Sequence, residues 1–248
     1  MIYPGKNLKY TLFLDIETVP EFQTYDEMSE LYQSLWDRKS HLIWKDNASW
    51  TKSISANLYT EKAGIYSEFA KVICISVGYF KDMEVLRIKS FFGHEEKEVL
   101  HQFSELIQNY YDDPKLYFLC GHNIKEFDIP FLCRRMVKHS VAMPTMFDIA
   151  GKKPWQTEHF VDTVDLWRFG DIKNYTSLQL LCAMLNVPTP KDDIDGSMVA
   201  GVYYEQQDLD RIKVYCQKDV ISVARIMMKF SGLEPVSDEQ VELAESQE

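Results

Sequence analysis

LFLDIETVP, residues 12–20, has the pattern of a buried β-strand that is interrupted by two acids. The apolar residues favour the interior of a sheet, whereas an unpaired carboxylate is among the groups that an interior tolerates least. Because side chains alternate between the two faces of a strand, Asp15 and Glu17 lie side by side on one face, where their negative charges repel each other. A divalent cation bound by both carboxylates would relieve this repulsion.

The length and composition of the chain predict one globular domain. The 248 residues, of which 46% are hydrophobic, are enough to bury a sizeable core. We expect the domain to span residues 1–232, with an insert at about 21–71, followed by an acidic, flexible tail at 233–248. The sequence has neither an apolar run of about 18 residues that could cross a bilayer nor a secretory signal. We therefore expect a soluble, cytoplasmic protein with no membrane partner.

The charge of the chain limits how it could hold a nucleic acid. Thirty-eight Asp and Glu residues against 27 Lys and Arg residues give a formal net charge of −11, the wrong sign for bulk attraction to a polyanion. Such a substrate would have to be held locally, by metal ions and a few basic groups, or with help from a protein partner. The five cysteines are scattered and odd in number, so they indicate reduced core thiols rather than disulfides or a zinc site.

Hydrophobic periodicity predicts a mixed order of strands and helices. Two β-branched and aromatic runs separated by a Lys81-Asp82 turn indicate an antiparallel hairpin. The segment from Glu21 to Lys71 is too long and too aromatic for a simple turn. A lid on the substrate side is a hypothesis for this insert, whose role the sequence does not reveal. Further strands are expected at 115–123 and 159–167, and helices at 95–111, from Asp128 onward, at 178–187 after a Thr176 or Ser177 cap, and at 209–230.

Two further segments carry acids in apolar surroundings. Tyr215 and Asp219 are four residues apart, so they share one face of the last predicted helix with apolar neighbours. Asp128 lies at the end of a predicted strand, where α/β proteins place ligands. Taken singly, each pattern also fits a strand end, a helix cap or a half-exposed helix face. Together with Asp15 and Glu17, they predict one site built from four carboxylates on three distant segments.

These residues resemble the motifs of a known family. Asp15 and Glu17 in LDIET, Asn123 and Asp128 in HNIKEFD, and Tyr215 and Asp219 in YCQKD are similar to the DnaQ-like (DEDD) superfamily of 3′–5′ exonucleases, in its variant with a tyrosine in the third motif. With DGSMV at 195–199, the chain looks most like stand-alone bacterial proteins similar to the proofreading domain of family B DNA polymerases. The resemblance spans residues 12–230, although no polymerase domain follows.

The resemblance implies a fold and a set of residue roles. The fold would be RNase H-like α/β, with a mixed sheet whose opening strands are antiparallel and whose faces carry helices. Two Mg²⁺ or Mn²⁺ ions would be held by Asp15, Glu17, Asp128 and Asp219, with Asp15 contacting both, and such hard cations prefer oxygen ligands. Tyr215 would orient the attacking water. Substrate contacts are implied for Ile16, Thr18, Asn123 and Phe127, with Asn123 alternatively ordering the site.

Several other polar and aromatic residues allow two interpretations each. Asp162 and Asp165 either approach the site or cap a neighbouring element, and His122 is expected to be a structural histidine. The basic clusters either form a solvated surface or contact phosphates. The tryptophans of the insert either pack internally or stack on unpaired bases. The residues concerned are Arg134, Arg135, Lys138 and His139, Lys152 and Lys153, and Trp36, Trp44 and Trp50.

The resulting functional expectation is a metal-dependent exonuclease. It would release nucleoside 5′-monophosphates from the 3′ ends of single-stranded nucleic acid, with DNA preferred. An exoribonuclease is the near alternative, because no residue of the site indicates a test for the 2′-hydroxyl. A non-catalytic nucleic-acid or protein-binding module with this fold is the rival from another class. Such a module is expected to have lost an acid or the tyrosine, and this sequence has lost neither.

Overall fold

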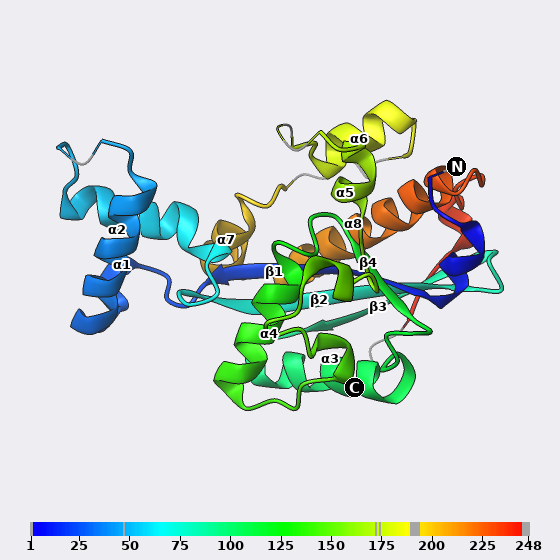
Figure 1. Ribbon diagram of the computed structural model, residues 1–248. Coiled ribbons are helices and arrows are strands. Elements are labelled where there is room, and N and C mark those ends of the chain that lie inside the picture. The colour runs from blue at the N-terminus through cyan, green and yellow to red at the C-terminus, as the bar shows by residue number, and fades with distance from the viewer. Residues whose placement is uncertain (1, 47, 172, 174, 189–193, 245–248) are drawn as a thin grey trace.

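A six-stranded mixed sheet forms the centre of the computed structural model, which describes residues 2–46, 48–171, 173, 175–188 and 194–244 (Figure 1). The strand order is β5-β4-β1-β2-β3-β6. The acid-bearing strand β1 is therefore central, antiparallel to β2 and parallel to β4. The strands are β1 (Thr11–Pro20), β2 (Ala70–Lys81), β3 (Val85–Phe92), β4 (Phe118–Gly121), β5 (Phe160–Asp162) and β6 (Val241–Leu243).

Helices cover both faces of the sheet (Figure 1). Leu12, Leu14 and Ile16 of β1 pack in one core cluster with residues of α3 and α4. Phe13 packs on the other side, with residues of α8. The strand thus alternates between two buried faces, as its sequence predicts. The helices are α1 (Glu30–Ile43), α2 (Lys52–Lys62), α3 (Glu96–Tyr110), α4 (Asp128–His139), α5 (Thr163–Arg168), α6 (Leu178–Leu185), α7 (Val199–Gly201) and α8 (Leu209–Phe230), and Val202–Gln206 continues α7 as a π-helical turn.

A glycine lets α8 approach the sheet closely. A Cβ atom built on Gly78 of β2 would lie 2.9 Å from Cγ1 of Val220 in α8 and 2.8 Å from Cδ1 of Ile88 in β3. Both distances are too short for contacts between carbon atoms, so only glycine at this position of β2 allows α8 to pack this close to the sheet. The position of α8 also sets the positions of Tyr215 and Asp219, which are both on this helix.

The insert is an ordered helical unit with its own core. The buried Trp36 of α1 packs edge-on against Tyr59 of α2 and Phe69, and its indole nitrogen donates to the carbonyl of Ser55 over 2.8 Å. In Figure 1, α1 and α2 lie beside the ends of β1 and β2, away from the rest of the sheet. Trp44 and Trp50 also donate hydrogen bonds within the insert. All three tryptophans thus take part in contacts within the insert.

A buried ion network ties both ends of the insert to α3 and α4. The Arg135 guanidinium, which is 1% exposed, donates from Nε to Glu96 over 2.8 Å and from Nη1 to the carbonyl of Ser67 over 2.8 Å. It also pairs with Glu21 over 2.7 Å, and Glu21 accepts a second hydrogen bond from Lys138. Glu21 and Ser67 are near the two ends of the insert, so one side chain of α4 holds both.

Two expectations differ from the structure. The strand expected at 159–167 is only three residues long, because the Asp162 carboxylate accepts a hydrogen bond from the N–H of Val164 and so caps α5. The segment 233–248 was expected to be a flexible tail, whereas Val241–Leu243 forms β6 and pairs in parallel with β3. The buried Arg225 of α8 anchors the approach to this strand by pairing with Asp238. Residues 245–248 lie outside the described residues.

The remaining predicted elements are confirmed. The β2–β3 hairpin has its turn at Asp82 and Met83, which both adopt positive φ angles, and α6 is capped by Ser177. The cysteines are free, and only Cys133 is not fully buried. Within the described ranges, no helix is both long and apolar enough to cross a bilayer.

Replacing Arg135 with Met should lower the free energy of unfolding by about 3 kcal/mol, because it leaves the buried Glu96 carboxylate without its main partner. The exposed neighbour Arg134 supplies the control, and Arg134→Met should change stability by less than about 0.5 kcal/mol. Urea denaturation followed by circular dichroism measures both values. Equal stabilities for the two variants would show that the network does not hold the fold.

Candidate active site

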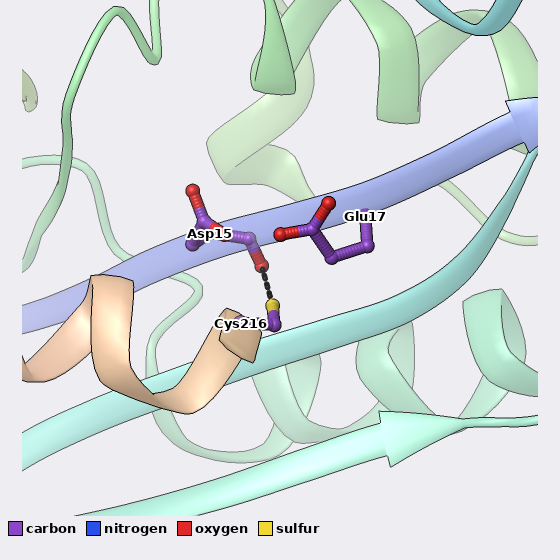
Figure 2. Close-up of side chains that lie close together, drawn as sticks. All are labelled: Asp15, Glu17 and Cys216. Carbon is purple, nitrogen blue, oxygen red and sulfur yellow. Dashed lines mark hydrogen bonds between the residues drawn. The ribbon is translucent and has the colours of Figure 1, made fainter. Parts of the chain in front are cut away.

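Asp15 and Glu17 lie on the face of β1 that is covered by α8. They pair with Ser76 and Cys74 of β2, respectively, and the register between the strands shifts directly after Glu17. Figure 2 shows both side chains with Cys216 of α8 below them. Ligand atoms of Asp15, Glu17 and Cys216 lie within 4.8 Å of one another, close enough to share one metal ion. The sequence-based pairing of the two acids is thus present in the structure.

Cys216 supports the site as a hydrogen-bond donor. Its Sγ donates to the backbone carbonyl of Asp15 over 3.4 Å, as the dashed line in Figure 2 shows. Burial raises the pKa of the Cys216 thiol well above its usual value, with smaller contributions from Cys74 and the two acids. The sulfur therefore stays protonated, and a neutral thiol is a poor ligand for a hard cation. Sequence reasoning placed this cysteine in the core and missed its contact with the site.

The helix α8 brings Tyr215 and Asp219 to the same place. Both line a cavity of about 500 Å³ together with Asp15. Burial raises the pKa of the Tyr215 phenol, and the negative charges of Asp219, Glu17 and Asp15 and a hydrogen bond with Asp219 raise it further. The phenol therefore keeps its proton and can act as a hydrogen-bond donor in this cavity.

Asp128 completes the carboxylate group from the opposite layer of helices. It is the first residue of α4 and is 3% exposed. Burial raises its pKa to about 7, and although backbone hydrogen bonds oppose this shift, the charges of Asp162 and Asp219 add to it. Burial also raises the pKa of Asp15 well above its usual value, followed by the charges of Asp219 and Asp128. The charge of Asp219 thus contributes to the raised pKa values of Asp15, Glu17 and Asp128.

Glu17 follows the same pattern as Asp15. Burial raises its pKa well above the usual value, and the next contributions come from Asp15 and Asp219. No Lys or Arg is among the described residues that line the cavities next to these acids. A cluster of oxygen ligands whose ionisation is opposed by burial and mutual repulsion fits a hard divalent cation, which would replace the protons.

A second cavity of about 240 Å³ lies beside Glu17. It contains three of the four residues for which substrate contact was expected, and Asn123 lines neither cavity. The N–H of Asn123 donates to Asp162 over 2.9 Å, and its φ angle is 65°. This geometry fits the alternative that Asn123 orders the site. The cavity is lined by Ile16, Glu17, Thr18, Pro20, Thr60, Glu61, Gly64, Ile65, Phe127, Gly196, Ser197 and Ala200.

Residues 194–200 separate the two cavities. Ile194, Asp195 and Met198 line the larger one, whereas Gly196, Ser197 and Ala200 line the smaller one. This segment includes the DGSMV motif at 195–199. Tyr175, Ser177 and Gln179 also line the larger cavity. Nothing in the sequence indicated that these three residues belong to the site, because only the tertiary fold brings the segment before α6 to β1.

The remaining polar candidates have structural contacts. Both ring nitrogens of His122 have partners, Thr163 Oγ1 at 2.8 Å and the Thr176 carbonyl at 3.0 Å, although this histidine also lines the larger cavity. Asp162 accepts hydrogen bonds from three backbone N–H groups, and Asp165 pairs with Lys125 over 3.0 Å.

Three basic residues of α4 form ion pairs with acids. Arg135 and His139 bind Glu96, and Lys138 binds Glu21. Lys152 lies 3.9 Å from Asp148. The basic clusters, including the exposed Arg134 and Lys153, line neither of the two cavities. The expectation of a solvated surface is therefore wrong for Arg135, which is buried in an ion network, whereas the exposed Arg134, Lys138 and Lys153 fit it better than they fit a phosphate site.

Comparison with known proteins gives one family. No curated protein matches the chain. A family model matches residues 65–247, which include Asp128, Tyr215 and Asp219, whereas Asp15 and Glu17 precede the matched stretch. The mixed six-stranded sheet with helices on its faces is consistent with an RNase H-like exonuclease fold. The chain therefore belongs to the family of predicted 3′–5′ exonucleases related to the exonuclease domain of PolB, which supports a nuclease function.

Proposed function

We propose that the protein is a metal-dependent exonuclease that removes nucleotides from the 3′ ends of single-stranded nucleic acid, with DNA preferred. The observation that carries this proposal is that Asp15, Asp219 and the protonated Tyr215 line one cavity and Glu17 lines the other, while the charge of Asp128 at the start of α4 acts on the same acids. Each released product would be a nucleoside 5′-monophosphate.

The four carboxylates would hold two divalent ions, Mg²⁺ or Mn²⁺. Asp15 is close to both Glu17 and Asp219, so it is the residue that could contact both ions. When bound, the ions would supply positive charge that activates water and stabilises the phosphate and the departing oxygen. The cavity linings offer no Lys or Arg among the described residues, which leaves the phosphate dependent on these ions.

Tyr215 would position the water that attacks the phosphorus. Its hydroxyl is hydrogen-bonded to Asp219 and is held in the neutral form. In the reaction, the water oxygen bonds to phosphorus, and the bond between phosphorus and the 3′ oxygen of the preceding nucleotide breaks. The proton released by water balances the one that the new 3′-hydroxyl gains. Correct placement of the water is the contribution expected from this side chain.

The smaller cavity would receive the terminal nucleoside. Ile16 and Phe127 offer apolar surface to a base. Thr18, whose hydroxyl donates its hydrogen to the Gly64 carbonyl, offers an acceptor oxygen beside Glu17. This placement supports the substrate roles inferred for Ile16, Thr18 and Phe127. Asn123 is proposed to act by ordering the connection between β4 and α4, through its contact with Asp162.

A gel time course on single-stranded DNA and RNA of one sequence, labelled at the 5′ end, tests the reaction. With Mg²⁺ or Mn²⁺ the DNA should shorten from its 3′ end, and Asp15→Asn should slow this by at least about a thousandfold, because it removes a shared ion ligand. Asp26→Asn, a change of an exposed acid in the insert, is the control and should cleave normally. Faster cleavage of RNA would favour the exoribonuclease, and folded protein that cleaves neither strand would favour the binding module.

Replacing Tyr215 with Phe should lower kcat by roughly a hundredfold and leave KM nearly unchanged, because only the orientation of water is lost. Single-turnover and steady-state measurements on the same DNA separate the two constants. Unchanged kcat would remove Tyr215 from the mechanism, and an equal loss of substrate binding would assign it to the substrate site instead.

The raised carboxylate pKa values make the metal-free protein sensitive to pH. Burial raises the pKa of Asp128 from its ordinary value of 3.8 to about 7 in the fold, so between these two pH values the native chain binds a proton that the unfolded chain lacks. The free energy of unfolding in EDTA should therefore include a term that falls as pH rises from about 4 to about 7. Asp128→Asn should remove that term, and Mn²⁺ should stabilise the wild type above pH 7.

Urea denaturation at a series of pH values, with EDTA or Mn²⁺, measures these terms. The comparison is between wild type and Asp128→Asn, because groups with lowered pKa values, such as Glu21, act in the opposite direction in both proteins. Identical pH profiles for the two proteins, or no stabilisation by Mn²⁺ at high pH, would contradict the proposed cluster.

A further inference from the structure

The insert supplies one wall of the smaller cavity. Thr60 and Glu61 of α2, with Gly64 and Ile65 of the turn that follows, face Ile16, Glu17, Thr18 and Phe127 across a space of about 240 Å³. The family model begins at residue 65, so most of the insert lies outside the matched stretch.

This wall is fixed to the body of the protein by several hydrogen bonds. Thr18 Oγ1 donates to the carbonyl of Gly64 over 2.7 Å, which joins the turn directly to β1 next to Glu17. Tyr204 donates to the carbonyl of Pro20 over 2.6 Å, where β1 leads into the insert. At the far end of the insert, the Ser67 carbonyl is held by Arg135. With its own core around Trp36, the insert is a preformed wall rather than a loose loop.

The chemistry of the cavity suits a nucleoside better than a phosphate. Ile65 is 56% exposed although it is apolar, and it lines the cavity with Ile16 and Phe127. The charged residues of the described lining are the two acids Glu17 and Glu61. Apolar side chains offer contact to a base, and Glu61, the acid of this lining that is not among the proposed ion ligands, opposes the entry of an anionic group.

We propose that Ile65 and Glu61 are specificity residues that read the 3′-terminal nucleotide. Ile65 packs against the terminal base, and the negative charge of Glu61 disfavours strands that end in a 3′-phosphate relative to strands that end in a 3′-hydroxyl. This inference rests on the proposed exonuclease function and adds residues of the insert to its substrate site. The insert would then select the end of the strand by contact and by charge.

The test compares full-length variants on one single-stranded DNA that ends in either a 3′-hydroxyl or a 3′-phosphate. Ile65→Ala should raise KM for the 3′-hydroxyl strand roughly fivefold to tenfold and leave kcat unchanged, because the lost contact lies away from the reacting atoms. Glu61→Gln should raise kcat/KM for the 3′-phosphate strand roughly threefold relative to the 3′-hydroxyl strand, as expected for removing one exposed charge. Thermal melting confirms that each variant is folded.

Matched controls come from the same insert. Leu42 is 83% exposed and lines neither cavity, and Glu68 is an exposed acid that lines neither cavity. Leu42→Ala and Glu68→Gln should leave both constants unchanged on both strands. An unchanged KM in Ile65→Ala, or the same change in Leu42→Ala, would overturn the role of Ile65. An unchanged ratio between the two strands in Glu61→Gln would overturn the role of Glu61.

Failure of this inference is distinguishable from failure of the proposed function. If the wild type cleaves no strand, the exonuclease proposal fails, and binding of thymidine 5′-monophosphate with Mn²⁺ then decides the role of the wall by calorimetry. Weaker binding by Ile65→Ala than by Leu42→Ala supports a nucleotide-binding wall, whereas equal binding overturns it. If the wild type cleaves normally and the variants match their controls, only the inference about the wall fails.

Discussion

Repulsion among buried and half-buried carboxylates is the constraint on which the rest of the structure depends. Asp15, Glu17, Asp128 and Asp219 come from three elements that are distant in sequence, and burial together with mutual charge raises the pKa values of Asp15, Glu17 and Asp128. Such a cluster costs stability in a metal-free chain, so the surrounding fold must hold it together. Under the proposed function, the binding of divalent cations would be the physical reason to keep it.

The fold holds this cluster from three directions. The central position of β1 places its two acids under α8, and Gly78 allows that helix to lie close to the sheet. On the opposite layer, α4 begins with Asp128 and is tied through Arg135 to α3 and to both ends of the insert. The network around Arg135 therefore links the position of one acid to the position of the insert wall.

Local patterns in the sequence were enough to predict much of the fold and the candidate site. The alternation of a strand puts Asp15 and Glu17 together, and the period of a helix puts Tyr215 and Asp219 on one face. The hairpin turn at Asp82 and the cap at Ser177 also follow from local chemistry. These features depend on neighbours within a few residues, which a single sequence contains.

Features that depend on long-range contacts could not be predicted. Arg135 belongs to a basic run, yet its burial depends on Glu21 and Glu96, which are far away in sequence. The strand β6 lies in an acidic segment, and its pairing depends on the free edge of β3. The local sequence around Ile65 does not distinguish it from other apolar residues. Only the tertiary fold places it in the lining of the cavity that also contains Glu17. The charge of a side chain does not reveal its ion-pair partner, and the polarity of a segment does not reveal the strand with which it pairs.

The central claim is that the clustered carboxylates form a site for two divalent ions. Titration of the folded protein with Mn²⁺, followed by electron paramagnetic resonance, tests this claim without reference to any substrate. The account predicts two bound ions per chain with mutual spin coupling, and loss of that coupling in Asp219→Asn. Folded wild-type protein that leaves Mn²⁺ free in solution, or that binds it equally well after Asp219→Asn, would contradict the account.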